Sequence, residues 1–342
     1  MNKKVLVTGG SGFIGSNFIS ALIKKKYSVI NLDYLSYAST PDKFKNFYKN
    51  KNYKFIKNNI KSDKTVEKIF KNNKIDGIFN FASQSHVDRS ISSPKKFIIE
   101  NISSNLSFID QINFFYKKKF FSGKLINIST DEVYGNVEGT ASDELFPLLP
   151  NSPYASSKAS VDLILRSYNK TFGLPFINLR CCNNYGPFQF PEKFIPTIIL
   201  NLMNGKKIPV YGKGLNQREW IFVDDFCSAI EIIFRKGKNN NIYNVGSQNR
   251  ITNFELIKKI KQIFETKFNH KINKNYFKYV KDRPGHDTSY KMNANKIKKE
   301  LKWNAKVNFD DGLEKTIRWF MKNKNWIKYT QNKYRGERLG KL

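Results

Sequence analysis

Residues 125–135, LINISTDEVYG, bring two acidic side chains together beside a hydroxyl group. An apolar run leads into Thr130, and Asp131 and Glu132 follow directly. Adjacent carboxyl groups repel each other when both are ionised, and partial burial adds to this cost, so one of the two pKa values should rise. Such a pair holds one acid and one base near neutral pH, which suits the transfer of two protons on one substrate.

The two acids can face the same substrate only if the strand ends beside them. Successive side chains on a regular strand point to opposite faces. Gly135 follows closely and favours a break in the strand at this point. Two solvated loop acids with no chemical role remain an alternative interpretation of Asp131 and Glu132.

A glycine turn near the N-terminus predicts a dinucleotide site. Gly9, Gly12 and Gly15 lie between an apolar run and a helical pattern, and Asp33 ends the next apolar run. The glycines allow a tight turn and close approach to a pyrophosphate, which the free N–H groups of the helix start can bind. A carboxylate at Asp33 accepts hydrogen bonds from ribose hydroxyls and repels a 2′-phosphate, so NAD is favoured over NADP. A tight turn with no ligand is the alternative.

Tyr154 and Lys158 are four residues apart, so they share one face of a helix that Ser152 and Pro153 start and Gly173 ends. An ammonium group and a positively charged nicotinamide ring both stabilise a phenolate. We therefore expect the pKa of Tyr154 to fall from about 10 toward neutrality, which makes the tyrosine a usable base. The same spacing also occurs by chance, with a half-buried tyrosine and a solvated lysine.

Short apolar runs alternate with helical patterns and predict an α/β fold, a Rossmann-type doubly wound parallel sheet. After Arg180, Pro, Gly and irregular strands indicate a smaller, interleaved α/β domain, with helices over 253–267 and 308–325. The Rossmann domain is expected over 1–180, and 219–246 should return to it. The smaller domain is expected over 181–218 and 247–330. A basic tail is expected over 331–342, and the chain should be loose from about residue 327 onward.

The net charge of +32 comes from 60 basic and 28 acidic residues and by itself suggests a nucleic acid or an anionic membrane as partner. Only ten of the basic residues are Arg, and the Lys residues are scattered through every segment. This pattern is typical of a compositional drift that places Lys at tolerant surface sites. We expect no nucleic-acid partner, although a positive field would attract an anionic substrate.

Other composition signals favour a cytoplasmic enzyme. No apolar run approaches the roughly 20 residues of a membrane span. A strand pattern begins within three residues of Met1, which leaves no room for a signal peptide. Cys181, Cys182 and Cys227 are odd in number and lack metal-like spacing, so we expect reduced thiols and no metal site.

Seven motifs resemble one enzyme family: VLVTGGSGFIGSN, FASQSHVDRSI, ISTDEVYG, PNSPYASSKAS, CCNNYGPFQFPEKFIP, YGKGLNQREWIFVDD and DRPGHD. The chain is similar to the extended short-chain dehydrogenases/reductases that act on nucleotide sugars, and among them it most resembles the dTDP-glucose 4,6-dehydratases. The resemblance covers residues 1 to about 290 and continues in the C-terminal stretch LKWNAKVNFDDGLEKTIRWF.

The resemblance implies a reaction in three steps. The 4-hydroxyl proton goes to Tyr154 while hydride leaves C4, water is lost across C5 and C6, and hydride returns to C6. The family assigns the acid of the elimination to the position of Asp131, the base to that of Glu132, and a hydroxyl near O4 to that of Thr130. The product is a 4-keto-6-deoxy sugar, and NAD is regenerated.

The resemblance also implies contacts to ligands. Cofactor contacts map to Gly9, Gly12, Phe13, Ile14, Gly15, Asp33, Tyr34, Ser36, Asn59, Ile60, Phe81, Ala82, Tyr154, Lys158 and Asn184. Substrate contacts map to Ser85, Thr130, Asn183, Lys193, Pro209, Tyr211, Arg218, Asn253, Arg283 and His286. Physically, Arg and Lys can neutralise a diphosphate, and Arg does so through two hydrogen bonds.

Three positions depart from the family pattern: Gln84 replaces a usual Glu, Asn59 a usual Asp, and Glu100 a frequent Thr. They leave the nucleobase and sugar selectivity open. A UDP-glucose 4,6-dehydratase and a nucleotide-sugar 4-epimerase are the alternatives, although epimerases typically have small neutral residues in place of Asp131 and Glu132. A non-catalytic dinucleotide- or RNA-binding relative is a third reading, but it would need neither the acids nor the Tyr–Lys pair.

The resemblance finally implies a homodimer. It would form through the helix that carries Tyr154 and the preceding helical segment, 94–116, whose apolar residues recur on all sides.

Overall fold

The computed structural model describes residues 3–40 and 47–334, and its largest element is a parallel sheet of seven strands. The strand order is β10-β6-β5-β4-β1-β2-β3, which confirms the predicted doubly wound α/β fold. Its strands are β1 (Lys4–Thr8), β2 (Ser28–Asp33), β3 (Tyr53–Lys57), β4 (Gly77–Asn80), β5 (Lys124–Thr130), β6 (Phe176–Cys181) and β10 (Asn241–Val245).

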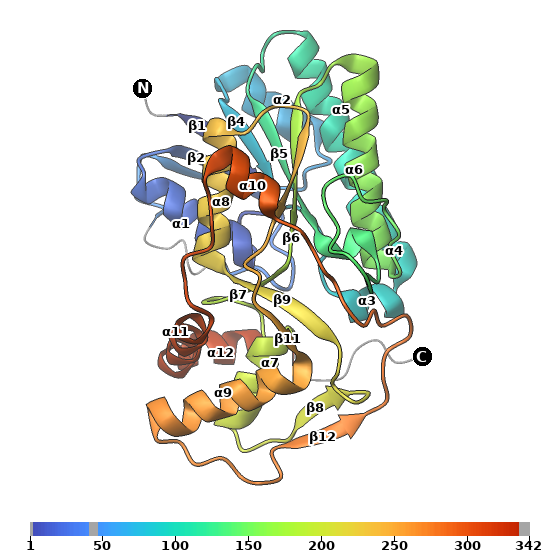
Figure 1. The fold of residues 1–342 in the computed structure, drawn as a ribbon. Coiled ribbons are helices and arrows are strands. Elements are labelled where there is room, and N and C mark those ends of the chain that lie inside the picture. The colour runs from blue at the N-terminus through green and yellow to red at the C-terminus, as the bar shows by residue number, and fades with distance from the viewer. Residues whose placement is uncertain (1–2, 41–46, 335–342) are drawn as a thin grey trace.

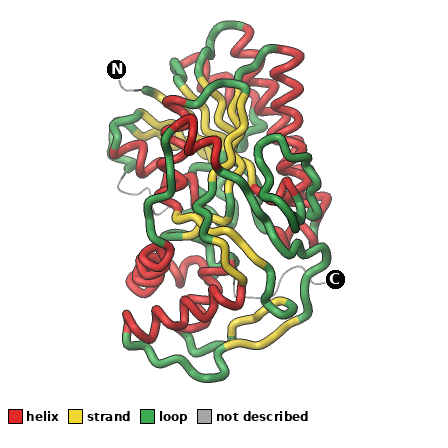
Figure 2. Tube along the Cα trace, in the orientation of Figure 1, coloured by secondary structure: helices red, strands yellow, loops and turns green. Residues whose placement is uncertain are grey.

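Helices cover both faces of this sheet, because its central strands are apolar on both sides and must be shielded from water (Figures 1 and 2). One face packs on α1 (Phe13–Lys24), α8 (Val223–Lys236) and α10 (Asn295–Leu301). The other packs on α2 (Asp63–Asn72), α5 (Ser104–Lys117) and α6 (Pro153–Phe172). The chain between β4 and α5 forms α3 (Val87–Ser92), α4 (Pro94–Ile98) and a π-helical turn, Ile99–Ser103.

A smaller part lies at the carboxyl ends of the large sheet (Figure 1). It holds a three-stranded sheet of β7 (Asn183–Tyr185), β9 (Gln217–Phe222) and β11 (Arg250–Thr252), and a pair of β8 (Ile208–Tyr211) and β12 (Phe277–Val280). Its helices α7 (Phe194–Met203), α9 (Asn253–Phe268), α11 (Phe309–Lys322) and α12 (Lys324–Gln331) enclose a separate apolar core.

The predicted returning segment, 219–246, brings α8 and β10 back to the large sheet, whereas its first residues belong to β9 of the small sheet. The domain boundaries themselves stay a prediction. The helix expected over 253–267 is present as α9, and a capping box of Thr252 and Glu255 starts it.

The helix expected over 308–325 and the loose tail expected from residue 327 are both wrong in detail. The backbone of Asn323 is not helical, so α11 ends there and a separate helix, α12, begins. Ile327 of α12 is buried in the small core, and this burial orders a segment whose polar composition had suggested a tail. Of the tail predicted at 331–342, residues 335–342 lie outside the described residues.

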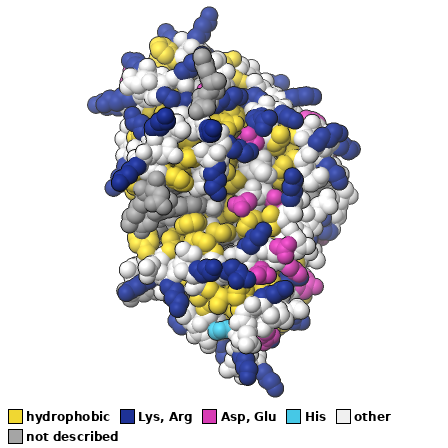
Figure 3. All heavy atoms as spheres, turned by 90° about the vertical axis from the view of Figure 1, so that its left-hand side faces the viewer, with side chains coloured by type: hydrophobic (Ala, Val, Ile, Leu, Met, Phe, Trp, Pro, Cys, Tyr) yellow, Lys and Arg dark blue, Asp and Glu magenta, His cyan; other side chains and the backbone are white. Residues whose placement is uncertain are grey.

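Within the described ranges, we find no helix with the length and apolar character needed to cross a membrane. Figure 3 shows Lys and Arg spread over the visible face rather than gathered in one band. That distribution agrees with the interpretation of Lys as a general surface residue.

Candidate active site

A cleft of about 1040 Å³ opens at the carboxyl ends of the large sheet and extends to the small part. Ligands bind at this edge in doubly wound folds. Every residue predicted for the cofactor or the substrate lines this cleft, as do Thr130, Glu132, Tyr154 and Lys158. Asp131 alone does not, because it is 2% exposed and lies below the cleft surface.

The dinucleotide end of the cleft fits the predicted cofactor. Gly9 has a φ of +64°, and a Cβ there would meet the backbone nitrogen of Ala82 at 2.8 Å. The first turn of α1 begins at Gly12 without a side-chain cap, so its N–H groups stay available to a phosphate. Asp33 accepts hydrogen bonds from the backbone N–H groups of Ser11 (2.9 Å) and Leu35 (2.7 Å). These two bonds fix the orientation of a carboxylate that still has lone pairs for ribose hydroxyls.

The acidic pair sits where the strand breaks, as the chemistry requires. β5 ends at Thr130, and a 3₁₀ turn, Asp131–Tyr134, follows at once. Gly135 closes the turn with a φ of +73°, and a Cβ there would meet the carbonyl oxygen of Leu149 at 2.0 Å, so no other residue fits. The Thr130 hydroxyl donates to Asp131 Oδ1 at 3.2 Å and accepts from the Glu132 N–H at 3.3 Å.

The two carboxyl groups have different electrostatic surroundings. Burial, followed by the charges of Glu132 and Glu219, raises the pKa of Asp131 well above its usual value. Burial also raises the pKa of Glu132, but Arg283, Arg218 and Lys193 act against this rise. Glu132 Oε2 is buried and has no hydrogen-bond partner among the described residues. The surroundings of the pair therefore favour protonation of Asp131 over protonation of Glu132.

Replacing Asp131 by Asn should stabilise the fold, and the gain should grow as the pH rises. The folded pKa lies above the unfolded one, so the folded chain keeps a proton that the unfolded chain loses above pH ~4. The free energy of unfolding of the wild type then falls by up to roughly 1.4 kcal/mol per pH unit until the folded pKa is passed. Asn does not ionise, so the variant loses the part of the pH dependence of the free energy of unfolding that comes from Asp131. Thermal unfolding at acidic and alkaline pH measures the difference, with Asp63→Asn on the exposed start of α2 as control. An equal effect at all pH values would contradict a neutral, buried Asp131.

Tyr154 and Lys158 lie on the predicted helix, α6, which Ser152 caps by accepting from the Ala155 N–H. Lys158 Nζ donates to the carbonyl oxygen of Ile128 at 2.5 Å, in the strand that leads to the acids. This bond ties the helix to β5 and sets the position of the tyrosine beside the acidic turn.

The expected fall in the pKa of Tyr154 is not what the chain by itself produces. Burial, followed by the charges of Glu132, Cys181 and Asp131, raises this pKa well above 10. Burial also lowers the pKa of Lys158, which weakens the cation that was expected to act. The prediction combined Lys158 with a bound nicotinamide ring, so it stays a prediction for the enzyme with its cofactor; in the chain by itself, burial and the nearby acids outweigh the ammonium group of Lys158. A usable phenolate here therefore depends on positive charge from a bound nicotinamide.

A buried ion pair connects the two elements that carry the predicted catalytic residues. Arg180 Nε lies 3.0 Å from Asp162 Oδ2, one helical turn after Lys158. Arg180 Nη1 also donates to the hydroxyl of Tyr134 at 2.9 Å, in the turn that carries the acids. The guanidinium thus joins α6 to the acidic turn.

The other end of the cleft is basic. Arg283 Nη1 lies 3.1 Å from Asp88 Oδ1, and the Tyr211 hydroxyl donates to Asp88 Oδ2 at 3.2 Å. Arg218 is held by backbone carbonyl oxygens, including that of Asp287 at 3.0 Å, and its guanidinium lies over the ring of Tyr290. These contacts fix the orientation of the side chains that were predicted to bind a diphosphate.

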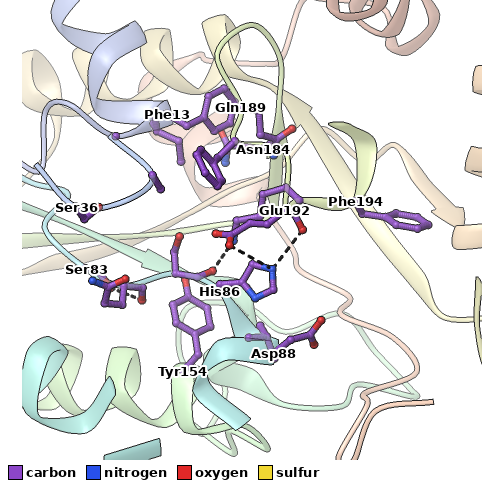
Figure 4. Close-up of a pocket in the computed structure, with 18 of the residues that line it drawn as sticks. Phe13, Ser36, Ser83, His86, Asp88, Tyr154, Asn184, Gln189, Glu192 and Phe194 are labelled. Atoms are coloured by element: carbon purple, nitrogen blue, oxygen red, sulfur yellow. Dashed lines mark hydrogen bonds and ion pairs between the residues drawn. The ribbon is translucent and has the colours of Figure 1, made fainter. Parts of the chain in front are cut away.

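Sequence reasoning missed two acids of this cleft, Asp88 and Glu192. Asp88 contacts two predicted substrate residues, and Glu192 contacts Tyr37, His86 and Arg89. Figure 4 shows Glu192 beside His86. Both acids lie in motifs that carried the resemblance, SHVDRS and FPEKF. Their position inside those motifs was the available signal.

The parallel doubly wound sheet, the glycine turn facing Asp33 and the Tyr–Lys pair beside two acids define an NAD-dependent enzyme of the extended short-chain dehydrogenase/reductase type. A family model described as GDP-mannose 4,6 dehydratase matches residues 6–316. A dTDP-glucose 4,6-dehydratase of Escherichia coli is 39% identical over 98% of this chain and 99% of its own. One of Xanthomonas campestris is 37% identical over 98% of each. The chain therefore belongs to this family of nucleotide-sugar 4,6-dehydratases.

Solved structures of dehydratases agree with this assignment, but structures of epimerases have nearly the same fold. The dTDP-glucose 4,6-dehydratase of Bacillus anthracis, solved with NAD, has a TM-score of 0.86 and 40% identity over 96% of this chain and 99% of its own. A UDP-glucose 4-epimerase of Thermotoga maritima reaches 0.83 with 28% identity over 93% and 99%. The fold by itself therefore does not separate dehydratase from epimerase, and the residues of the site must.

Proposed function

We propose that this chain converts dTDP-glucose to its 4-keto-6-deoxy product. The buried acid pair at Asp131 and Glu132 carries the proposal, since the surroundings of the two carboxyl groups push their protonation states apart. The names of the most similar relatives support dTDP as the nucleotide.

The residues would divide the work as follows. Bound NAD supplies a hydride acceptor and, later, a hydride donor. Tyr154 takes the proton of the 4-hydroxyl, and Thr130, which also lines the cleft, hydrogen-bonds to O4. Glu132 removes the C5 proton that the ketone has acidified, using its unpartnered oxygen. Asp131 delivers a proton to the departing 6-hydroxyl, either through the Thr130 hydroxyl that bonds to it or after its side chain turns.

A 4-epimerase has no use for this arrangement. Reversible oxidation at C4 needs a hydride acceptor and the Tyr–Lys pair alone. A protonated acid and an ionised base buried next to the same sugar would destabilise an epimerase fold without helping its chemistry. The acid pair therefore favours elimination over epimerisation.

Incubation of the purified protein with dTDP-glucose tests the proposal. The 4-keto product is followed by its absorbance in alkali, and UDP-glucose is assayed in parallel. Faster conversion of UDP-glucose would transfer the proposal to the UDP-sugar reaction. Formation of dTDP-galactose without a keto product would establish an epimerase instead. Absence of turnover with both sugars would overturn the dehydratase proposal.

We also propose a homodimer that forms through α5, α6 and the π-helical turn. Ile99, Leu106, Phe114 and Leu163 are 51%, 40%, 52% and 53% exposed on these neighbouring elements. Burial of such residues against a second copy removes apolar surface from water. Light scattering should give twice the chain mass, and Leu106→Lys combined with Leu163→Lys should shift it to the monomer. A monomeric wild type would refute the dimer.

The proposed compartment is the cytoplasm. Cys181, Cys182 and Cys227 are all buried and form no disulfide among the described residues, which suits a reducing environment. The spread of Lys and Arg over the face shown in Figure 3 favours an anionic small molecule over a nucleic acid as partner.

A further inference from the structure

Glu192 is a buried carboxylate that joins the two parts of the molecule across the cleft. Its side chain is 2% exposed. Its oxygens lie 2.7 Å from the Tyr37 hydroxyl and 2.8 Å from Arg89 Nε, and the Arg89 guanidinium lies over the Tyr37 ring. His86 Nε2 lies 3.2 Å from the backbone carbonyl oxygen of Glu192. Figure 4 shows the two residues side by side. We call Glu192, Tyr37, His86 and Arg89 the Glu192 cluster.

Tyr37 belongs to the wall that holds the cofactor. It follows β2 in a segment that is fixed at both ends to the dinucleotide site. At one end the Leu35 N–H donates to Asp33, and at the other the Thr40 N–H donates to the carbonyl oxygen of Ser11, in the glycine turn. A displacement of Tyr37 would therefore also move the groups that are predicted to hold the dinucleotide.

Glu192 belongs to the opposite wall. It lies in the segment between β7 and α7, next to Lys193, whose Nζ donates to the carbonyl oxygen of Ser85 at 2.5 Å. The same segment contains Gln189, whose side chain donates to the carbonyl oxygen of Asn184 at 2.8 Å. Loss of the contacts of Glu192 would make this segment more mobile, and the segment lines the cleft from the cofactor end to the substrate end.

The proposed reaction demands a closed cleft. A hydride that leaves C4 must return to C6 of the same sugar, so the reduced cofactor has to stay bound between the two transfers. If it left after the first transfer, the products would be free NADH and an unreduced 4-ketosugar, and the enzyme would need new NAD⁺ for each turnover. A contact that joins the two walls of the cleft would oppose this loss.

We infer that Glu192 is a positioning residue that helps to retain the reduced cofactor. It does so by connecting the cofactor wall, which contains Tyr37, to the opposite wall, which contains Glu192 itself. The inference rests on the proposed function, because that reaction requires the reduced cofactor to stay bound. Its test does not, because cofactor exchange can be followed without any sugar. Two changes separate the contacts. Glu192→Gln removes the charge pair with Arg89, and Tyr37→Phe removes one hydroxyl bond and leaves the ring in place.

The experiment measures two quantities on the intact holoenzyme. The first is the rate at which bound NADH leaves when excess ADP-ribose is added, followed by NADH fluorescence. The second is the ratio of free NADH to finished 4-keto-6-deoxy product during turnover of dTDP-glucose. Both variants should release NADH at least about tenfold faster, because truncating one partner of a buried charged contact acts mainly on the dissociation rate. Both should also release free NADH during turnover, and the double variant should be less than additive.

Glu314→Gln is the matched control. It also removes the carboxylate of a Glu–Arg pair, with Arg318 at 2.6 Å on α11, outside the cleft. It should exchange NADH at the wild-type rate. A purely structural role for Glu192 would lower the unfolding temperature and total turnover without changing the NADH-to-product ratio. Wild-type exchange rates in both Glu192→Gln and Tyr37→Phe would overturn the inference. If neither sugar is converted, the exchange rates still decide it.

Discussion

Tyr154→Phe is expected to lower turnover by about 10²- to 10⁴-fold while the protein keeps its bound NAD. The phenolic hydroxyl is the group positioned to take the 4-hydroxyl proton, and phenylalanine keeps the ring that packs in the buried site. Because burial and the neighbouring acids raise the pKa of Tyr154, the proton transfer depends on positive charge from the cofactor. Loss of the hydroxyl should therefore block the first hydride transfer, and no NADH should form.

Stopped-flow absorbance of NADH and the content of bound nucleotide measure this result. Tyr168→Phe provides a matched control, since it removes a hydroxyl from the same helix, where the group bonds to Asp110 at 3.2 Å. It should turn over like the wild type. A Tyr154→Phe enzyme with normal turnover would show that another group accepts the 4-hydroxyl proton.

Asp131→Asn has the second large expected effect, namely an enzyme that oxidises C4 but eliminates water slowly. Asn has nearly the shape of a protonated Asp but no transferable proton, so the departing 6-hydroxyl would leave without acid assistance. NADH absorbance should then accumulate, and product formation should slow by about 10²- to 10⁴-fold. Normal elimination in this variant would mean that the acid lies elsewhere. That outcome matters because Asp131 lies beneath Thr130 rather than on the cleft surface.

Hydrogen exchange at C5 separates the two carboxyl groups. Asp131→Asn keeps the base, so the C5 hydrogen of the 4-ketosugar should exchange with deuterated solvent while water loss is slow. Glu132→Gln removes the base, so exchange and elimination should both stop. Equal behaviour of the two variants would contradict the division of roles between acid and base.

The local patterns of the sequence were sufficient to predict much of this protein. The glycine turn, the acid that ends β2, the caps of α6 and the break after Thr130 are each specified by neighbours within a few residues. Because parallel strands present their carboxyl ends at one edge of a sheet, the predicted fold is sufficient to bring these motifs together. The single helix predicted over 308–325 was wrong in detail, because the chain breaks at Asn323. The helix α12 that follows is stabilised by packing against a core from distant parts of the chain.

Tertiary structure alone decided the charge states and the long-range contacts. Glu219 faces Asp131, while Arg218, Arg283 and Lys193 face Glu132, and these residues come from widely separated segments. The same holds for Tyr154, whose pKa is raised by burial and by charges from other segments, and for the contacts of the Glu192 cluster. Burial and Coulomb energy depend on distances in space between groups far apart in the chain, and no local pattern encodes those distances.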